Sequence, residues 1–159
     1  MSYRFVPMTR GDAHAIVEWS YEEPYSFYDM ENDPEDLEHF LDDSRWENRS
    51  FAVHDDEGLA GFFTFDVVAT VNDGTAVEIV LGMEPSRTGE RRGVEFVEAG
   101  LDFARERYAV EVFRLAVAAF NERAIRVYQS VGFEKEETYQ QETNGGEYEF
   151  VAMSRPVEL

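Results

Sequence analysis

The stretch VAAFNERAIRVYQSVGFE, residues 117–134, decides the fold because it contains a strand end, a helix start and a helix end in sequence. Alternating apolar residues over 111–120 predict a strand. Asn121 follows as the cap of a short helix, and Gly132 ends that helix. The helix has one apolar face, which carries Ala124, Ile125, Tyr128 and Val131. The stretch therefore predicts a strand followed by a helix that packs on a sheet.

The same two periodicities predict the other elements on either side of this stretch. Pro7 near the end of the first strand indicates an edge position. Thr9 caps the first helix, and Asp33 caps the second, with Pro34 at its first position. The predicted elements are a strand at 3–8, a helix at 10–20, a loop at 21–33, a helix from 34 to about 44, two strands within 50–70 joined by an Asp-Asp-Glu-Gly turn, a strand at 75–83, a helix at 90–108, the strand and helix above, and a closing hairpin of 133–143 and 147–154.

The resulting order is β-α-α-β-β-β-α-β-α-β-β. It combines antiparallel hairpins with crossovers through single helices, which predicts a mixed α/β fold with helices packed on a mixed sheet. A chain of 159 residues with this order fits one domain, and we expect it to extend over 1–159.

The charge balance is the unusual bulk property. There are 34 acidic and 14 basic residues, a formal net charge of −20, and Lys135 is the only lysine. Such a surface repels nucleic acid, so we expect no nucleic-acid partner. Acid-rich, lysine-poor chains resemble proteins of salt-loving organisms, in which concentrated salt screens the self-repulsion. An ordinary acidic protein is the alternative.

Residue types that are absent from the sequence, or that are scattered along it, exclude other functions. The chain has no cysteine, which excludes disulfides, thiolate metal sites and a cysteine nucleophile, and favours a cytoplasmic location. The N-terminus has no long apolar region, and no stretch approaches the roughly 18 apolar residues of a membrane span. His14, His39 and His54 stand singly, so neither a metal site nor a Ser-His-Asp arrangement is expected.

Two segments resemble the cofactor-binding motifs of the GNAT superfamily of N-acetyltransferases. The first is EIVLGMEPSRTGERRGVEFVEAGLDFA, 78–104, in which a strand leads through a glycine-bearing loop into a long helix. The second is 117–134, with Asn121, an alanine three residues later, a tyrosine four beyond that, and a closing Gly-Phe. The element order also matches over essentially the full chain. The resemblance implies direct transfer of an acetyl group from acetyl-CoA to a primary amine of a small molecule or protein, without a metal.

The first segment departs from the family pattern, because Thr88 and Arg91 replace the leading basic residue and the middle glycine. In this family the CoA pyrophosphate sits on backbone N–H groups at a helix N-terminus. Three arginines against one glutamate make 87–93 locally positive, although pairing with nearby carboxylates is the alternative for them. The resemblance implies cofactor contacts at Leu81, Gly82, Met83, Arg87, Thr88, Gly89, Glu90, Arg91, Arg92, Gly93, Asn121, Arg123 and Arg126.

Two side chains match the needs of acetyl transfer. Tyr128 stands where many family members keep a general acid near the sulfur; the alternative is a core tyrosine. Glu78 looks like the glutamate base of the histone-acetyltransferase branch. Its apolar neighbours Val77 and Ile79 suit a base, although strand alternation alternatively points it at solvent. The backbone of Leu81 to Met83 is expected to polarise the thioester carbonyl.

The loop after the first helix is the expected acceptor side. Its aromatic residues alternate with carboxylates, a combination that suits a cationic amine. Hydrophobic anchoring is the alternative. The candidate substrate residues are Trp19, Tyr25, Phe27 and Tyr28. A non-catalytic acyl-CoA sensor on the same fold remains the rival function, and both a monomer and a homodimer remain open.

Overall fold

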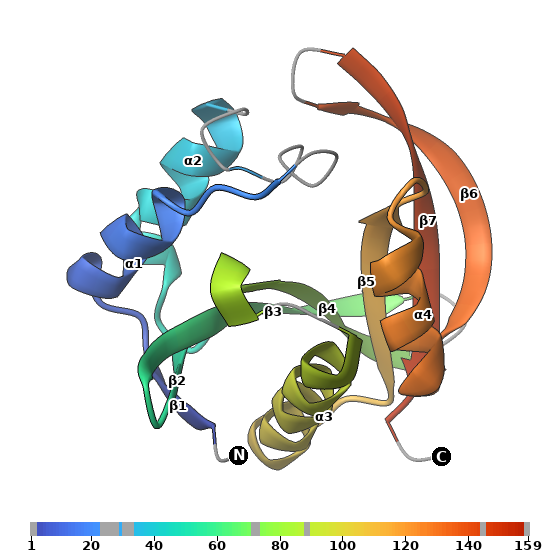
Figure 1. Ribbon diagram of the computed structural model, residues 1–159. Helices are drawn as coiled ribbons and strands as arrows, with labels where there is room; N and C mark the ends of the chain where they lie inside the picture. Colours follow the sequence, from blue (N-terminus) through green and yellow to red (C-terminus); the bar gives the residue numbers. More distant parts are fainter. Residues whose placement is uncertain are drawn as a thin grey trace. The chain divides into compact units, whose positions relative to one another are not determined.

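The computed structural model describes residues 3–22, 29, 34–70, 74–87, 90–143 and 146–157. Its elements are β1 (Arg4–Pro7), α1 (Arg10–Val17), α2 (Pro34–Leu41), the short helix η3 (Asp43–Arg45), β2 (Ser50–Asp55), β3 (Gly58–Thr70), β4 (Gly74–Met83), the short helix η4 (Pro85–Arg87), α3 (Glu90–Arg107), β5 (Val112–Ala118), α4 (Glu122–Ser130), β6 (Glu134–Thr143) and β7 (Gly146–Pro156). Figure 1 shows them coloured along the chain.

The strands form a seven-stranded sheet in the order β1-β2-β3-β4-β5-β7-β6. β4 and β5 pair in parallel, whereas β1–β2, β2–β3 and β5–β7 pair antiparallel. The predicted mixed α/β fold and the predicted order of elements are therefore confirmed. Pro7 ends β1, which is an edge strand as predicted, so its missing N–H breaks no ladder.

The residues form two compact units. Unit 1 comprises Met1–Thr64, Leu81–Thr88 and Glu142–Glu147, and unit 2 comprises Phe65–Val80, Gly89–Gln141 and Tyr148–Leu159. That the whole chain is one domain stays a prediction.

Two helices are shorter than their sequence pattern predicts. Thr9 caps α1 as expected and accepts a hydrogen bond from the Asp12 N–H at 3.1 Å, but α1 ends at Val17. The next N–H groups bond three residues back, which tightens the chain and stops the helix. The second predicted helix is likewise two elements, since α2 ends at Leu41 and η3 follows it. The predicted cap Asp33 lies outside the described residues.

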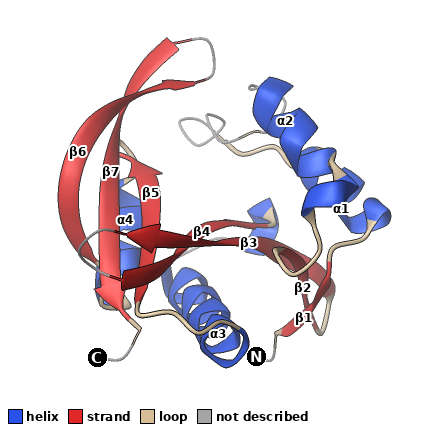
Figure 2. Ribbon diagram, turned by 180° about the vertical axis from the view of Figure 1, so that it is seen from behind, coloured by secondary structure: helices blue, strands red, loops and turns tan. Residues whose placement is uncertain are grey.

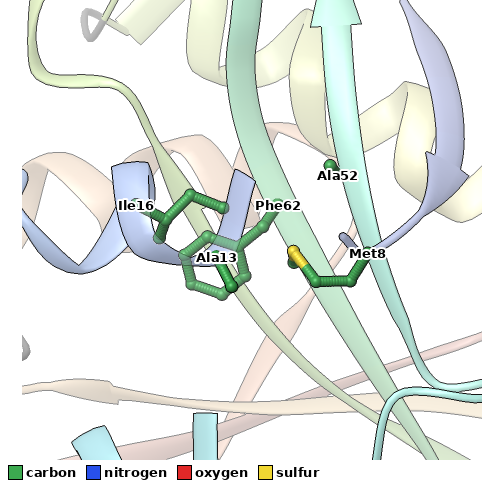
Figure 3. Close-up of a cluster of buried hydrophobic side chains, with 5 residues drawn as sticks. All are labelled: Met8, Ala13, Ile16, Ala52 and Phe62. Carbon is green, nitrogen blue, oxygen red and sulfur yellow. The ribbon is translucent and has the colours of Figure 1, made fainter. Parts of the chain in front are cut away.

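The core of unit 1 joins α1 to the first strands. Its buried side chains come from the residue directly after β1, from α1, and from β2 and β3, and Figure 3 shows Met8, Ala13 and Ile16 beside the Phe62 ring. Phe40 of α2 adds an edge-on contact to that ring, with centroids 5.1 Å apart. The cluster consists of Met8, Ala13, Ile16, Ala52 and Phe62.

The sheet part of unit 2 buries one face under α3 and α4. On β5, Phe113, Leu115 and Val117 are buried, and Arg105 of α3 lies over the Phe113 ring at 5.9 Å. Figure 1 shows α4 in front of β5 and β7, and Figure 2, seen from behind, shows it on their far side. Alternation then places the even-numbered residues of β5 on the other face.

Candidate active site

A glycine brings the first turn of α3 against α4. A Cβ atom added at Gly93 would lie 3.1 Å from Cγ2 of Val127, so a larger residue would force the two helices apart. Arg123 precedes Val127 by one helical turn and shares its face. The first turn of α3 therefore lies beside the helix that carries Arg123.

Asn121 begins α4 as predicted. Its side-chain oxygen accepts a hydrogen bond from the Ala124 N–H at 3.1 Å, and the residue is buried. This confirms the capping role, while its contact with a cofactor stays a prediction. Arg123 is half-buried and Arg126 is exposed, on a helix whose N-terminus carries a partial positive charge.

The predicted phosphate segment is only partly described. Thr88 and Gly89 lie outside the described residues, and of Glu90 and Arg91 the structure describes the helical backbone alone. Arg92 is exposed in the first turn of α3. Arg91 therefore occupies a helical position, where the family motif has its middle glycine.

Arg87 is paired with two carboxylates. Its guanidinium contacts Asp55 at 2.8 Å and Glu84 at 2.6 Å, and the side chains of Arg87 and Asp55 are only 14% and 3% exposed. The hydrogen bonds from Arg87 hold the pKa of Asp55 below its usual range, and those contacts raise the pKa of Arg87. Arg87 thus joins η4 to the end of β2, and its contact with a cofactor stays a prediction. The alternative of pairing with carboxylates holds here.

Tyr128 is half-buried near the end of α4. Its ring meets Phe133 edge-on with centroids 6.0 Å apart. The Phe133 N–H donates to the Tyr128 carbonyl at 2.9 Å, and Gly132 makes that turn with a φ of 101°. The end of the helix thus fixes the ring's position, and its role as an acid stays a prediction.

Glu78 is exposed on β4, so of the two alternatives the solvent-facing one holds, and its role as a base stays a prediction. Val77 and Ile79 are buried on the opposite face of the strand, because successive side chains alternate. Glu78 instead stands opposite Arg114 of β5, which stands opposite Ser154 of β7. The Arg114 guanidinium lies 3.8 Å from the Glu136 carboxylate. A row of polar side chains therefore crosses the face of this part of the sheet opposite α3 and α4.

Tyr139 lies near that row and had no predicted role. Burial raises its pKa, and the charges of Glu137 and Glu78 raise it further, so the hydroxyl keeps its proton. The ring stacks on Phe150 with centroids 6.2 Å apart. Tyr139 is the one aromatic residue in the polar sequence of β6, which is the signal that sequence reasoning missed.

A tyrosine in the segment after α1 holds the backbone at the end of β4 by a hydrogen bond. The Tyr21 hydroxyl donates to the Met83 carbonyl at 2.7 Å, and the Tyr21 N–H donates to Asp29 at 2.9 Å. Trp19 is half-buried against the core cluster of unit 1, which favours anchoring over substrate contact. The other candidate substrate residues, Tyr25, Phe27 and Tyr28, lie outside the described residues.

Gly82 permits a close approach at the same strand end. A Cβ atom there would lie 2.6 Å from the ring of Phe62, closer than real contacts allow. Leu81, Gly82 and Met83 are half-buried. The predicted thioester-binding backbone is thus packed on the core of unit 1.

Within the described ranges, no group of three or more His, Asp or Glu side chains is placed to hold a metal ion. None of the helices described is long and apolar enough to cross a membrane.

The model of the acetyltransferase (GNAT) domain family matches residues 3–134. The chain belongs to the GNAT acetyltransferase family. The predicted family and the predicted enzyme class, an acetyltransferase, are therefore confirmed. No protein of curated function matches the sequence.

Solved GNAT structures share the fold at low identity. The aminoglycoside N(6')acetyltransferase from Legionella pneumophila is 19% identical, with a TM-score of 0.76 over 99% of this chain and 95% of that one. The spermidine N-acetyltransferase from Vibrio cholerae, in complex with CoA and spermine, is 18% identical, with a TM-score of 0.74 over 97% and 95%. A GNAT-family acetyltransferase from Bacillus anthracis is 15% identical, with a TM-score of 0.74 over 100% and 97%. Identities this low show the common fold and leave the acceptor open.

Proposed function

We propose that this GNAT protein transfers the acetyl group of acetyl-CoA directly to a primary amine of a small molecule or protein. The observation that carries the proposal is the close packing of α3 on α4 at Gly93 and Val127. It leaves the N–H groups of the first turn of α3 beside α4, and such groups bind phosphate anions. Arg92 and Arg123 add positive charge there, in a chain of net charge −20.

The chemistry divides among three further groups. The backbone of Leu81 to Met83 polarises the thioester carbonyl. Glu78 takes a proton from the amine, whose nitrogen then forms a bond to the carbonyl carbon. The carbon–sulfur bond breaks, and Tyr128 gives its proton to the departing thiolate. Exposure of Glu78 supports its role, because a solvent-facing carboxylate can pass its proton to water.

The acceptor is proposed to be a cationic amine. A strongly acidic protein attracts cations to its surface and raises their local concentration. The polar row on the face of unit 2 opposite α3 and α4 carries a second carboxylate, Glu136, in addition to the proposed base Glu78. The Legionella and Vibrio proteins are named as acetyltransferases of an aminoglycoside and of spermidine, both of which are amines. These names agree with a cationic amine as acceptor but do not identify which amine this chain acetylates.

Acetyl-CoA should stabilise the fold by mass action. At one hundred times its dissociation constant, the expected gain in unfolding free energy is about 2.7 kcal/mol. The Arg92→Glu variant should lose most of this gain at fixed ligand concentration, whereas Arg107→Glu, an exposed charge reversal at the other end of α3, should keep it. Thermal unfolding with and without millimolar acetyl-CoA measures both effects. An unchanged wild-type melting temperature would contradict the proposed cofactor site.

We further propose that the protein is adapted to high salt and works in the cytoplasm. Folding should improve from low to molar KCl, because salt screens repulsion among the 34 acidic side chains. Unfolding free energies measured by urea titration across this KCl range test the adaptation. Greatest stability at low ionic strength would rule it out.

The rival function is a non-catalytic acyl-CoA sensor. Arg91 favours it, because a side chain replaces the glycine at which the family motif lets the backbone approach the pyrophosphate. Both functions predict binding of acetyl-CoA, and only the transferase predicts amine-dependent release of CoA. A turnover assay with an amine therefore separates the two functions.

The oligomeric state is a separate question, and sedimentation at high salt decides between a monomer and a homodimer.

A further inference from the structure

The last peptide unit of β4 is held at both of its polar atoms. The Met83 carbonyl accepts the Tyr21 hydroxyl at 2.7 Å, although the two residues lie 62 positions apart in sequence. The N–H of the same peptide unit, that of Glu84, donates to the Ala60 carbonyl at 2.8 Å. Turning this peptide plane would break both hydrogen bonds, so its orientation is fixed.

Neighbouring contacts restrict the strand further. The Phe62 ring fills the space beside Gly82, and Phe62 itself belongs to the buried cluster of unit 1. The Tyr21 backbone is tied in turn by its N–H bond to Asp29 at 2.9 Å. The tyrosine is therefore anchored at both ends, and its hydroxyl is held onto β4.

We infer that Tyr21 is a positioning residue, which holds the backbone of Leu81 to Met83 in the orientation that polarises the thioester carbonyl. The inference rests on the proposed function. A carbonyl is polarised by N–H donors aimed at the position its oxygen takes in the transition state, and small misalignments of such donors lower the rate. Tyr21 acts through the strand and need not touch the substrate.

The surroundings of Tyr21 keep its hydroxyl a donor. Burial raises its pKa well above the usual range, and the charges of Asp29 and Glu84 raise it further. The hydroxyl therefore retains its proton at the alkaline pH at which amine acceptors lose theirs. The hydrogen bond to Met83 persists across the pH range in which acetyl transfer to a neutral amine is fastest.

The test removes the hydroxyl alone. In Tyr21→Phe, kcat should fall about 5-fold, the effect of one neutral hydrogen bond, while the dissociation constant for acetyl-CoA changes less than about 2-fold. Infrared difference spectra of bound acetyl-CoA, labelled with carbon-13 at the carbonyl, should show the thioester band shifted toward its position in free acetyl-CoA. Tyr148→Phe, at an exposed tyrosine outside the proposed site, should match wild type in all three measurements.

Each outcome decides the inference. A Tyr21→Phe enzyme with wild-type kcat and an unshifted carbonyl band would overturn the positioning role. So would a lower kcat and melting temperature with an unshifted band, because that pattern reports a structural role only. A wild type that binds no acetyl-CoA, or acetylates no amine, would overturn the proposed function itself and this role with it.

Discussion

Replacing Tyr128 with phenylalanine should lower kcat by about 10-fold to 100-fold, at the lower end of general-acid contributions, and leave the affinity for acetyl-CoA unchanged. Phenylalanine keeps the ring that packs edge-on against Phe133, so the fold and the cofactor site persist. The proton for the departing thiolate is lost, and that proton matters only in the transition state. Steady-state rates with a competent amine and calorimetric binding of acetyl-CoA, in the same salt, measure the two quantities.

Two further variants test the assignment of roles. Tyr139→Phe is the matched control, because it also removes a phenol hydroxyl and keeps an aromatic stack, here on Phe150. It should retain most of kcat. If Tyr139→Phe fell to the level expected of Tyr128→Phe while Tyr128→Phe kept its activity, the acid would be misassigned.

Glu78→Gln should shift the pH dependence of kcat to higher pH, where more of the amine is neutral and a base matters less.

Arg87→Met should destabilise the protein by about 3–5 kcal/mol, because it leaves Asp55 buried without its charged partner. The methionine keeps most of the apolar stem. Urea unfolding at fixed KCl gives the free-energy difference. Arg107→Met removes an exposed arginine that lies over the Phe103 ring, and should cost less than about 1 kcal/mol.

The pH dependence gives an independent check on this ion pair. Arg87 depresses the pKa of Asp55, so the pair's contribution to stability is fully present above the unfolded pKa of an aspartate, about 3.9. It is lost as pH falls through the lower folded pKa. The difference between wild type and Arg87→Met should therefore be largest near neutral pH and shrink in acid. A difference independent of pH would show that Arg87 acts by packing alone.

Local signals in the sequence predicted most of the fold. The caps at Thr9 and Asn121 and the edge position of Pro7 depend on neighbours within a few residues, and all three are confirmed. The end of α1 was missed, because the apolar pattern continues beyond Val17 while the backbone tightens. A periodicity reports which face is buried and does not report where a helix stops.

The candidate site was less predictable, because its contacts join distant parts of the chain. Arg87 meets Asp55 across 32 residues, and the nearby Glu84 does not by itself distinguish a paired arginine from a phosphate ligand. Tyr21 meets Met83 through one side-chain hydroxyl, which leaves no pattern in the loop that contains it. Strand alternation alone did not predict on which face of β4 Glu78 lies. The burial of Val77 and Ile79 in the structure places Glu78 on the opposite face.

Acetyl transfer itself is tested most directly by measuring amine-dependent release of CoA in molar KCl. The panel should include polyamines, aminoglycosides, amino acids and a peptide with a free N-terminus, and mass spectrometry should identify the product. The transferase account predicts that at least one amine gains an acetyl group on nitrogen, at a rate that saturates with both substrates. Tight binding of acetyl-CoA without acetylation of any amine would contradict that account and favour the sensor.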